Sequence, residues 1–141
     1  MTLEEVSDRL EINELLSRYC HALDQQDWPA YRAVFTEDAA LDFTAFGGPK
    51  GGVADIEAFL VPVLESLANA QHAISTVKID LTGDTTRARS AALVPMTTRA
   101  ADGTESTAIS GLWYEDELVR TATGWRISVR KQVRGWASSP I

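Results

Sequence analysis

Apolar residues recur at every third or fourth position along the first part of the chain, which predicts an amphipathic helix from Leu3 to Leu23. Charged residues fill most of the intervening positions and would face solvent. Thr2 followed by Glu5 fits a capping box, in which each side chain bonds to the backbone of the other at a helix start. The predicted apolar face consists of Val6, Leu10, Ile12, Leu15, Leu16, Tyr19, Ala22 and Leu23.

Two shorter helices are expected next. The first begins near Asp27, a candidate N-cap, with Pro29 in its first turn. The second covers residues 53–67 and contains Pro62, which should bend or split it because proline removes a backbone donor. The glycine-rich segment 44–52 is expected to be a loop. It is not a phosphate-binding loop, since it lacks the Gly-Lys-Ser/Thr ending.

Beyond residue 69 the helical period gives way to alternation of apolar and polar residues, which is typical of strands. The pattern predicts long strands separated by turns at 82–84, 101–103 and 122–124, and an earlier strand is expected at 37–43. Pro95 indicates a bulge or an edge position within its strand. The long strands are predicted over residues 72–81, 85–100, 105–121 and 125–136.

Helices that precede an antiparallel meander indicate an α+β fold. A strongly curved sheet around the long first helix would make a cone-shaped α+β barrel, closed by three helices from the N-terminal half. The inside of such a cone is a natural apolar pocket for a small molecule. We expect one domain over residues 1–141, because a chain of 141 residues suits a single core.

Composition narrows the classes of function. The net charge is −7 and no basic run exists, so we expect no nucleic-acid partner. Cys20 is the single cysteine, which excludes an internal disulfide and a cysteine-based zinc site. No second histidine lies at ligand spacing from His72, so we expect no metal and no cofactor. The chain start lacks the features of a secretory signal and no apolar run could span a bilayer, which favours a cytoplasmic protein without a membrane partner.

Several residues allow both a structural and a chemical role. His72 could be a satisfied core histidine or a base that works near neutral pH. Asp24 could be a solvated acid at a helix end, although the helix dipole disfavours it there. Tyr19 could be a core tyrosine or a proton donor. Arg130 shares strand parity with Arg126, Ser128 and Gln132, opposite Trp125 and Ile127, and could form a surface salt bridge or anchor an anion.

Aromatic and sulfur-containing residues add further alternatives. Trp113 and Tyr114 point to opposite faces of one strand, so only one of them can line the cavity. His21 lies off the apolar helix face and should be exposed. Cys20 is expected to be a small buried residue, since no base is placed to activate it.

Three segments resemble the SnoaL-like family of the nuclear-transport-factor-two-like superfamily. They are "LLSRYCHALDQQDWPAYRAVFTEDAALDF", "QHAISTVKIDLTGDTTRARS" and "ISGLWYEDELVRTATGWRISVRKQVRGW". The resemblance covers nearly the whole chain and implies the cone fold. That superfamily includes dehydratases, a dehydrochlorinase, ketosteroid isomerase, polyketide cyclases and non-catalytic binders, so the fold alone does not give the reaction.

The resemblance implies roles for four residues. Asp24 and His72 match an acid–base pair of the dehydratase branch. Tyr19 matches an aromatic residue that acts as a proton donor there, and Arg130 matches an arginine of the last strand. One departure is that "ALVPMTT" offers only apolar and hydroxyl groups where a bile acid dehydratase carries a second pocket aspartate.

We therefore expect a cofactor-independent lyase or isomerase that acts on a hydrophobic, polycyclic or polyketide-like molecule, with elimination of water as the first choice. His72 would take the proton, Asp24 would orient His72, and Tyr19 would donate to a hydroxyl or carbonyl. A non-catalytic binding protein and an assembly subunit are the alternatives, and a homodimer through the exposed sheet face is expected. The predicted substrate-binding residues are Arg130, Phe43, Phe46, Phe59, Leu60, Val94, Met96 and Trp113.

Overall fold

The computed structural model describes residues 1–83 and 85–139. Within them the chain forms three α-helices, α1 (Leu3–Asp24), α2 (Trp28–Arg32) and α3 (Val53–Glu65), and one short 3-10 helix, η1 (Thr44–Phe46). The strands are β1 (Phe35–Asp42), β2 (Lys50–Gly51), β3 (Asn69–Ala70), β4 (Ala73–Thr82), β5 (Thr85–Arg99), β6 (Glu105–Thr121) and β7 (Gly124–Ala137). The predicted turn at 82–84 includes Asp84, which lies outside the described residues.

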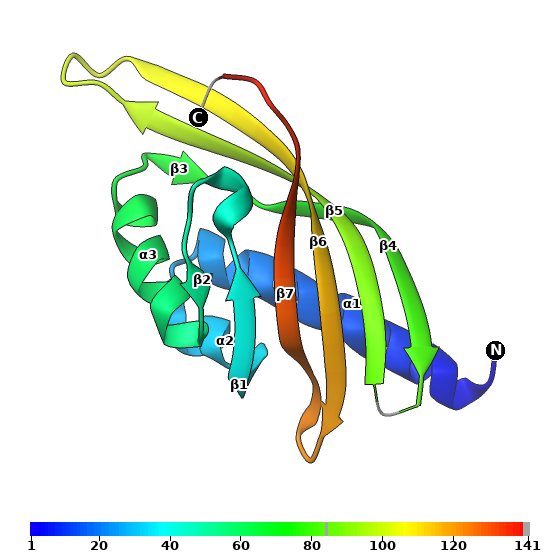
Figure 1. Ribbon diagram of the computed structural model, residues 1–141. Coiled ribbons are helices and arrows are strands. Elements are labelled where there is room, and N and C mark those ends of the chain that lie inside the picture. Colours follow the sequence, from blue (N-terminus) through cyan, green and yellow to red (C-terminus); the bar gives the residue numbers. More distant parts are fainter. Residues whose placement is uncertain (84, 140–141) are drawn as a thin grey trace.

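One curved sheet wraps around α1, and α2 and α3 lie on the same side of it near β1 and β2 (Figure 1). The strand order is β2-β1-β7-β6-β5-β3, with β4 also paired to β5. Strands β1 and β7 run parallel, whereas the other pairs are antiparallel. The predicted α+β cone, built from a mostly antiparallel sheet and three helices, is confirmed. No helix of the described residues is long and apolar enough to cross a membrane.

The first helix is fixed at its start and buried along its second half. The capping box is present, with Glu5 N bonded to Thr2 Oγ1 at 3.1 Å and Thr2 N to Glu5 Oε2 at 2.6 Å. The stripe that the sheet encloses begins at Ile12. Val6 and Leu10 of the predicted apolar face remain exposed, because the first turns of α1 project past the cone (Figure 1).

The two prolines behave differently from the simplest expectation. Pro62 lies in the last turn of α3 and does not split that helix, which continues to Glu65. Pro95 introduces no register shift between β5 and β6. At the opposite edge of β5, Pro95 lies between the residues that pair with β4 and the residues that pair with β3. A residue without an N–H group fits this gap between partners.

A bulge in β7 changes which side chains face the inside of the cone. Ile127 pairs with Leu118 and Val129 pairs with Glu117, so Ser128 is the extra residue between two register steps. Trp125 and Ile127 are buried before the bulge, and Arg130 is buried after it. The expectation that Arg130 lies opposite Trp125 and Ile127 is wrong, because one extra residue reverses the alternation.

Asp8 ties α1 to the β6–β7 end of the sheet. Its carboxylate accepts hydrogen bonds from Arg120 Nη2 at 2.8 Å and from Trp125 Nε1 at 3.1 Å. The hydrogen bond from Arg120 is the main cause that lowers the pKa of Asp8. Such a contact stabilises the folded chain only while the carboxyl is ionised.

Asp8→Asn is expected to lower the free energy of unfolding by about 1 kcal/mol at pH 7, a modest value because Arg120 is partly exposed. A carboxyl whose pKa is lower in the folded state than in the unfolded state contributes its full stabilisation above the unfolded-state pKa, about 3.9. This stabilisation disappears as the pH falls through the pKa of the folded state. The difference from wild type should therefore shrink below about pH 4. Urea unfolding at several pH values measures it, and a difference that persists unchanged in acid would contradict the assignment.

Candidate functional site

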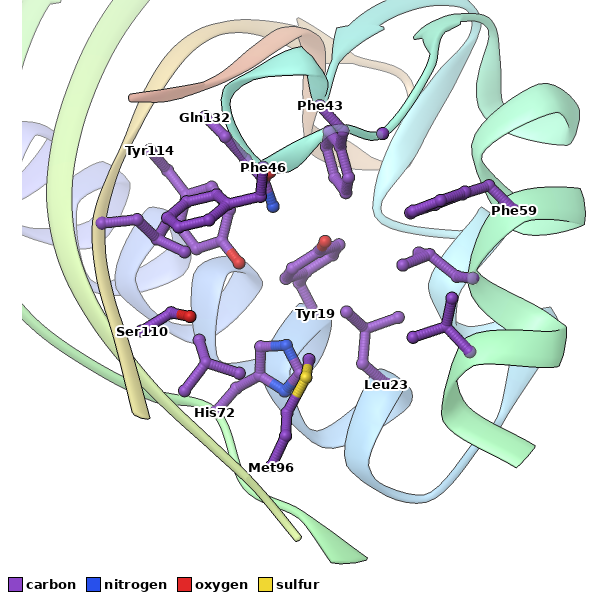
Figure 2. Close-up of a pocket in the computed structure, with 15 residues that line it drawn as sticks. Tyr19, Leu23, Phe43, Phe46, Phe59, His72, Met96, Ser110, Tyr114 and Gln132 are labelled. Carbon is purple, nitrogen blue, oxygen red and sulfur yellow. The ribbon is translucent and has the colours of Figure 1, made fainter. Parts of the chain in front are cut away.

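A cavity of about 220 Å³ lies between α1, α3 and the inner face of β5–β7 (Figure 2). Most of its wall is apolar, and its polar side chains are few. Six of the residues that sequence analysis assigned to substrate binding line it: Phe43, Phe46, Phe59, Leu60, Val94 and Met96. A concave apolar space with a few polar groups is the usual form of a small-molecule site.

His72 and Asp24 meet at this cavity although they are 48 positions apart. Asp24 is the last residue of α1, and His72 immediately precedes β4. The Nδ1 atom of His72 lies 2.6 Å from Asp24 Oδ1, and the backbone N–H of His72 lies 3.0 Å from both carboxylate oxygens. The His72 side chain is 5% exposed and that of Asp24 is 21% exposed. These contacts compensate for a carboxylate at the unfavourable end of a helix.

The contact with Asp24 determines the tautomer of His72. An ionised carboxylate only accepts hydrogen bonds, so the neutral imidazole must carry its proton on Nδ1. The Nε2 atom then keeps its lone pair, and it makes no hydrogen bond to any described residue. Because the ring lines the cavity beside Tyr19 and Met96, Nε2 can accept a proton from a bound molecule (Figure 2).

Tyr19 lines the cavity from α1, within a group of aromatic rings. Its ring centre lies 6.5 Å from that of His72 and 5.7 Å from that of Tyr114, both edge to face. Burial raises the pKa of Tyr19 to about 12, so its hydroxyl is protonated at neutral pH. That hydroxyl is near the hydroxyl of Tyr114, but no well-formed hydrogen bond satisfies it within the described residues. It is therefore available as a donor.

Arg130 lies behind the two tyrosines and is absent from the residues that line the cavity. Its guanidinium is completely buried and bonds Asp116 twice, at 2.8 and 2.9 Å. The Cζ atom lies 3.9 Å from the centre of the Tyr114 ring and 4.3 Å from that of Tyr19. Burial alone would lower the pKa of Arg130, but the adjacent Asp116 carboxylate outweighs it and the pKa is raised. Direct contact of Arg130 with a substrate anion was a wrong expectation.

Trp113 also lies elsewhere than expected. It is on the outer face of β6, where the guanidinium of Arg89 lies 4.6 Å from its ring centre. Tyr114 lines the cavity instead, which corrects the choice between the two. The alternation along β6 could have indicated this choice. Leu112 and Leu118 are an even number of residues from Tyr114, so their side chains point to the same face of the strand.

Sequence analysis did not identify two other polar residues of the wall. Ser110 lies on β6 and Gln132 on β7, and both line the cavity. Gln132 is the direct cross-strand partner of Tyr114. The bulge in β7 explains the miss, since upstream of Ser128 the residues that share parity with Gln132 lie on the face opposite the buried Trp125 and Ile127.

Cys20 and His21 are not part of this site. Cys20 is buried, and burial raises the pKa of its thiol to about 11, so the thiol stays protonated at neutral pH. His21 is exposed on α1, as its helical spacing predicts. Among the described residues, no group of three or more potential metal ligands occurs.

Comparison with known proteins gives similar chains, both curated relatives and solved structures. An uncharacterised protein of Mycobacterium tuberculosis (strain ATCC 25618 / H37Rv) is 36% identical over 134 residues, covering 95% of this chain and 90% of the relative. A solved protein from Kribbella flavida is 26% identical, with a TM-score of 0.86 over 96% of this chain and 95% of its own. A protein from Novosphingobium aromaticivorans DSM 12444, provisionally named a scytalone dehydratase, has a TM-score of 0.87 at 17% identity, covering 100% of this chain and 93% of its own. At that identity the likeness concerns the fold.

The SnoaL-like domain family matches residues 4–131, a span that contains Tyr19, Asp24, His72 and Arg130. Solved proteins of the same fold include one from Streptomyces avermitilis that is placed in the nuclear-transport-factor-two-like family. This chain belongs to the SnoaL-like domain family.

Proposed function

We propose that the protein is a cofactor-independent lyase or isomerase, with dehydration of a small hydrophobic molecule as the preferred reaction. The observation that carries this proposal is the 2.6 Å contact between His72 Nδ1 and Asp24 Oδ1 at the wall of an apolar cavity. It leaves Nε2 free to take a proton, and a fixed carboxylate stabilises the imidazolium that forms.

In the proposed dehydration His72 Nε2 takes a proton from the carbon next to a carbonyl group. The electron pair of that C–H bond forms a new C=C bond, and the C–O bond to the neighbouring carbon breaks. The departing hydroxyl receives a proton from Tyr19 and leaves as water. Proton return from the imidazolium to the tyrosine through solvent restores both groups, so the net products are an unsaturated ketone and water.

The size of the cavity indicates how much of a substrate it can hold. An apolar cavity of about 150 Å³ is known to take up benzene. A cavity of about 220 Å³ therefore suits a molecule of one or two rings. This favours a smaller substrate than the polycyclic compound considered from sequence.

The test follows 3-hydroxycyclohexanone and related one- and two-ring β-hydroxy ketones by the absorbance of the unsaturated ketone that forms. Asp24→Asn is expected to lower the turnover of the accepted compound by at least about 10²-fold, because an amide carries no charge to stabilise the imidazolium. Asp38→Asn is the matched control, since Asp38 is exposed and lies away from the cavity wall. Its turnover should equal that of wild type.

Two results would contradict the proposal. Turnover of Asp24→Asn equal to wild type would remove the proposed role of the pair. A wild-type protein that binds these ketones without converting any of them, and an Asp24→Asn variant with the same affinity, would indicate a non-catalytic binding protein.

A further inference from the structure

Three polar side chains of the cavity wall come from two paired strands. Ser110 and Tyr114 lie on the inner face of β6, and Gln132 lies opposite Tyr114 on β7. Figure 2 shows their polar ends on one side of the cavity, away from Phe59 of α3. The side chains of Ser110 and Gln132 make no hydrogen bond to any described residue, and Tyr114 has no well-formed one.

These three groups can donate hydrogen bonds but carry no charge. Burial raises the pKa of Tyr114 well above its ordinary value, so the hydroxyl remains a neutral donor. Within the described part of the chain, no Lys, Arg, Asp or Glu side chain lines the cavity. Among these described lining residues His72 is the one that can carry a positive charge, and it is already paired with the Asp24 carboxylate, so an anion bound there would lose its hydration without gaining a cation of its own.

We propose that Ser110, Tyr114 and Gln132 form a subsite for an uncharged ligand oxygen, so that the protein binds small neutral ring ketones and excludes carboxylates. This inference rests on the proposed function, because the bound oxygen is the carbonyl that activates the neighbouring C–H bond toward His72. The ring of the ligand lies against Phe59, Leu60 and Val63 of α3.

Arg130 supports this subsite from behind as a positioning residue. Its guanidinium lies 3.9 Å from the centre of the Tyr114 ring, and Asp116 holds it in place. A cation against the face of an aromatic ring is attracted to it, which holds the ring in place. The Tyr114 ring is therefore held at the cavity wall before a ligand binds.

The experiment uses three probes of nearly the same shape: acetophenone, α-methylstyrene and benzoate. They present a carbonyl oxygen, an apolar methylene group and a carboxylate at one position. Affinities are measured by nuclear magnetic resonance titration of wild type, Tyr114→Phe and Gln132→Met. The carbonyl stretching frequency of bound acetophenone is measured as well, because a hydrogen bond to the oxygen lowers it.

Tyr114→Phe is expected to weaken acetophenone binding roughly 3- to 20-fold. Its affinity for α-methylstyrene should change less than about twofold, since the lost hydroxyl has no partner on that probe. Gln132→Met should act in the same direction. The carbonyl frequency should rise in Tyr114→Phe, and benzoate should bind wild type at least about tenfold more weakly than acetophenone.

Tyr31→Phe is the matched control, because the Tyr31 hydroxyl bonds Val53 O and lies outside the cavity wall. It should leave the affinities for the probes unchanged. Equal acetophenone affinity and carbonyl frequency in wild type, Tyr114→Phe and Gln132→Met would overturn the subsite, as would benzoate binding as tight as that of acetophenone. Binding and turnover test different proposals. If acetophenone binding depends on Tyr114 but wild type dehydrates none of the β-hydroxy ketones, the proposed function is refuted and the subsite is retained.

Discussion

Replacing His72 with alanine is expected to lower kcat for dehydration of the accepted β-hydroxy ketone by about 10²–10⁴-fold, the usual contribution of a positioned base. His72 Nε2 is the one side-chain atom of the described cavity wall that can take up a proton from a bound molecule near neutral pH. Its loss leaves the apolar wall intact, so KM should change much less than kcat. Steady-state kinetics of purified wild type and variant measure both constants.

A second substitution separates loss of the base from loss of volume. His72→Gln keeps much of the side-chain size but provides no group that takes up a proton near neutral pH, so its kcat should fall as far as that of His72→Ala. His21→Ala is the control, because His21 is an exposed histidine on α1. Turnover of His72→Gln close to wild type would exclude His72 as the base.

Replacing Arg130 with methionine is expected to lower the free energy of unfolding by about 3–5 kcal/mol, because it leaves a buried carboxylate without its partner. The side chains of Arg130 and Asp116 are both 0% exposed and joined by two hydrogen bonds. Taking one charge away does not return the other to water. Urea unfolding at neutral pH measures the loss.

Two further variants show whether burial is the cause. The double variant Arg130→Met, Asp116→Leu should recover most of the stability, since no unpaired charge remains. Arg87→Met is the control on the exposed face of the same sheet, where Arg87 and Glu117 lie 3.7 Å apart and are 77% and 44% exposed. It should cost less than about 1 kcal/mol. Equal losses for Arg130→Met and Arg87→Met would contradict the distinction.

The expected homodimer stays a prediction. Leu93 and Trp136 are large apolar residues that are 49% and 48% exposed. Leu93 pairs with Gly111, and Gly111 pairs with Trp136, so these positions form one row across β5, β6 and β7. A contact between copies through the outer face of the sheet would cover this row.

Most of the elements could be predicted from the sequence because each has a strong local cause. The helical period and the capping box of Thr2 and Glu5 mark α1, and alternation between turn residues marks β4 to β7. The two-residue strands β2 and β3 were not predicted. Their short segments carry no periodicity, and they pair only because the curved sheet brings partners to them.

The candidate site was predicted in part, and the errors on β7 have one origin. Alternation along a strand tells which side chains share a face only while the register is regular. The extra residue Ser128 reverses the faces of β7, so the inward positions of Arg130 and Gln132 could not be read from Trp125 and Ile127. On β6, where the alternation holds from Leu112 to Asp116, Tyr114 could have been recognised as an inner residue.

The sequence by itself determined the α+β order, the amphipathic first helix and the presence of an acid at its end, since these follow from local spacing. Only the tertiary structure decided that Asp24 meets His72 and that Arg130 is held by Asp116 behind two tyrosines. The physical reason is that these contacts join residues far apart in the chain. They exist because the sheet curves around α1 and brings the inner face of β5–β7 opposite the helix that carries Tyr19 and Asp24 (Figure 1).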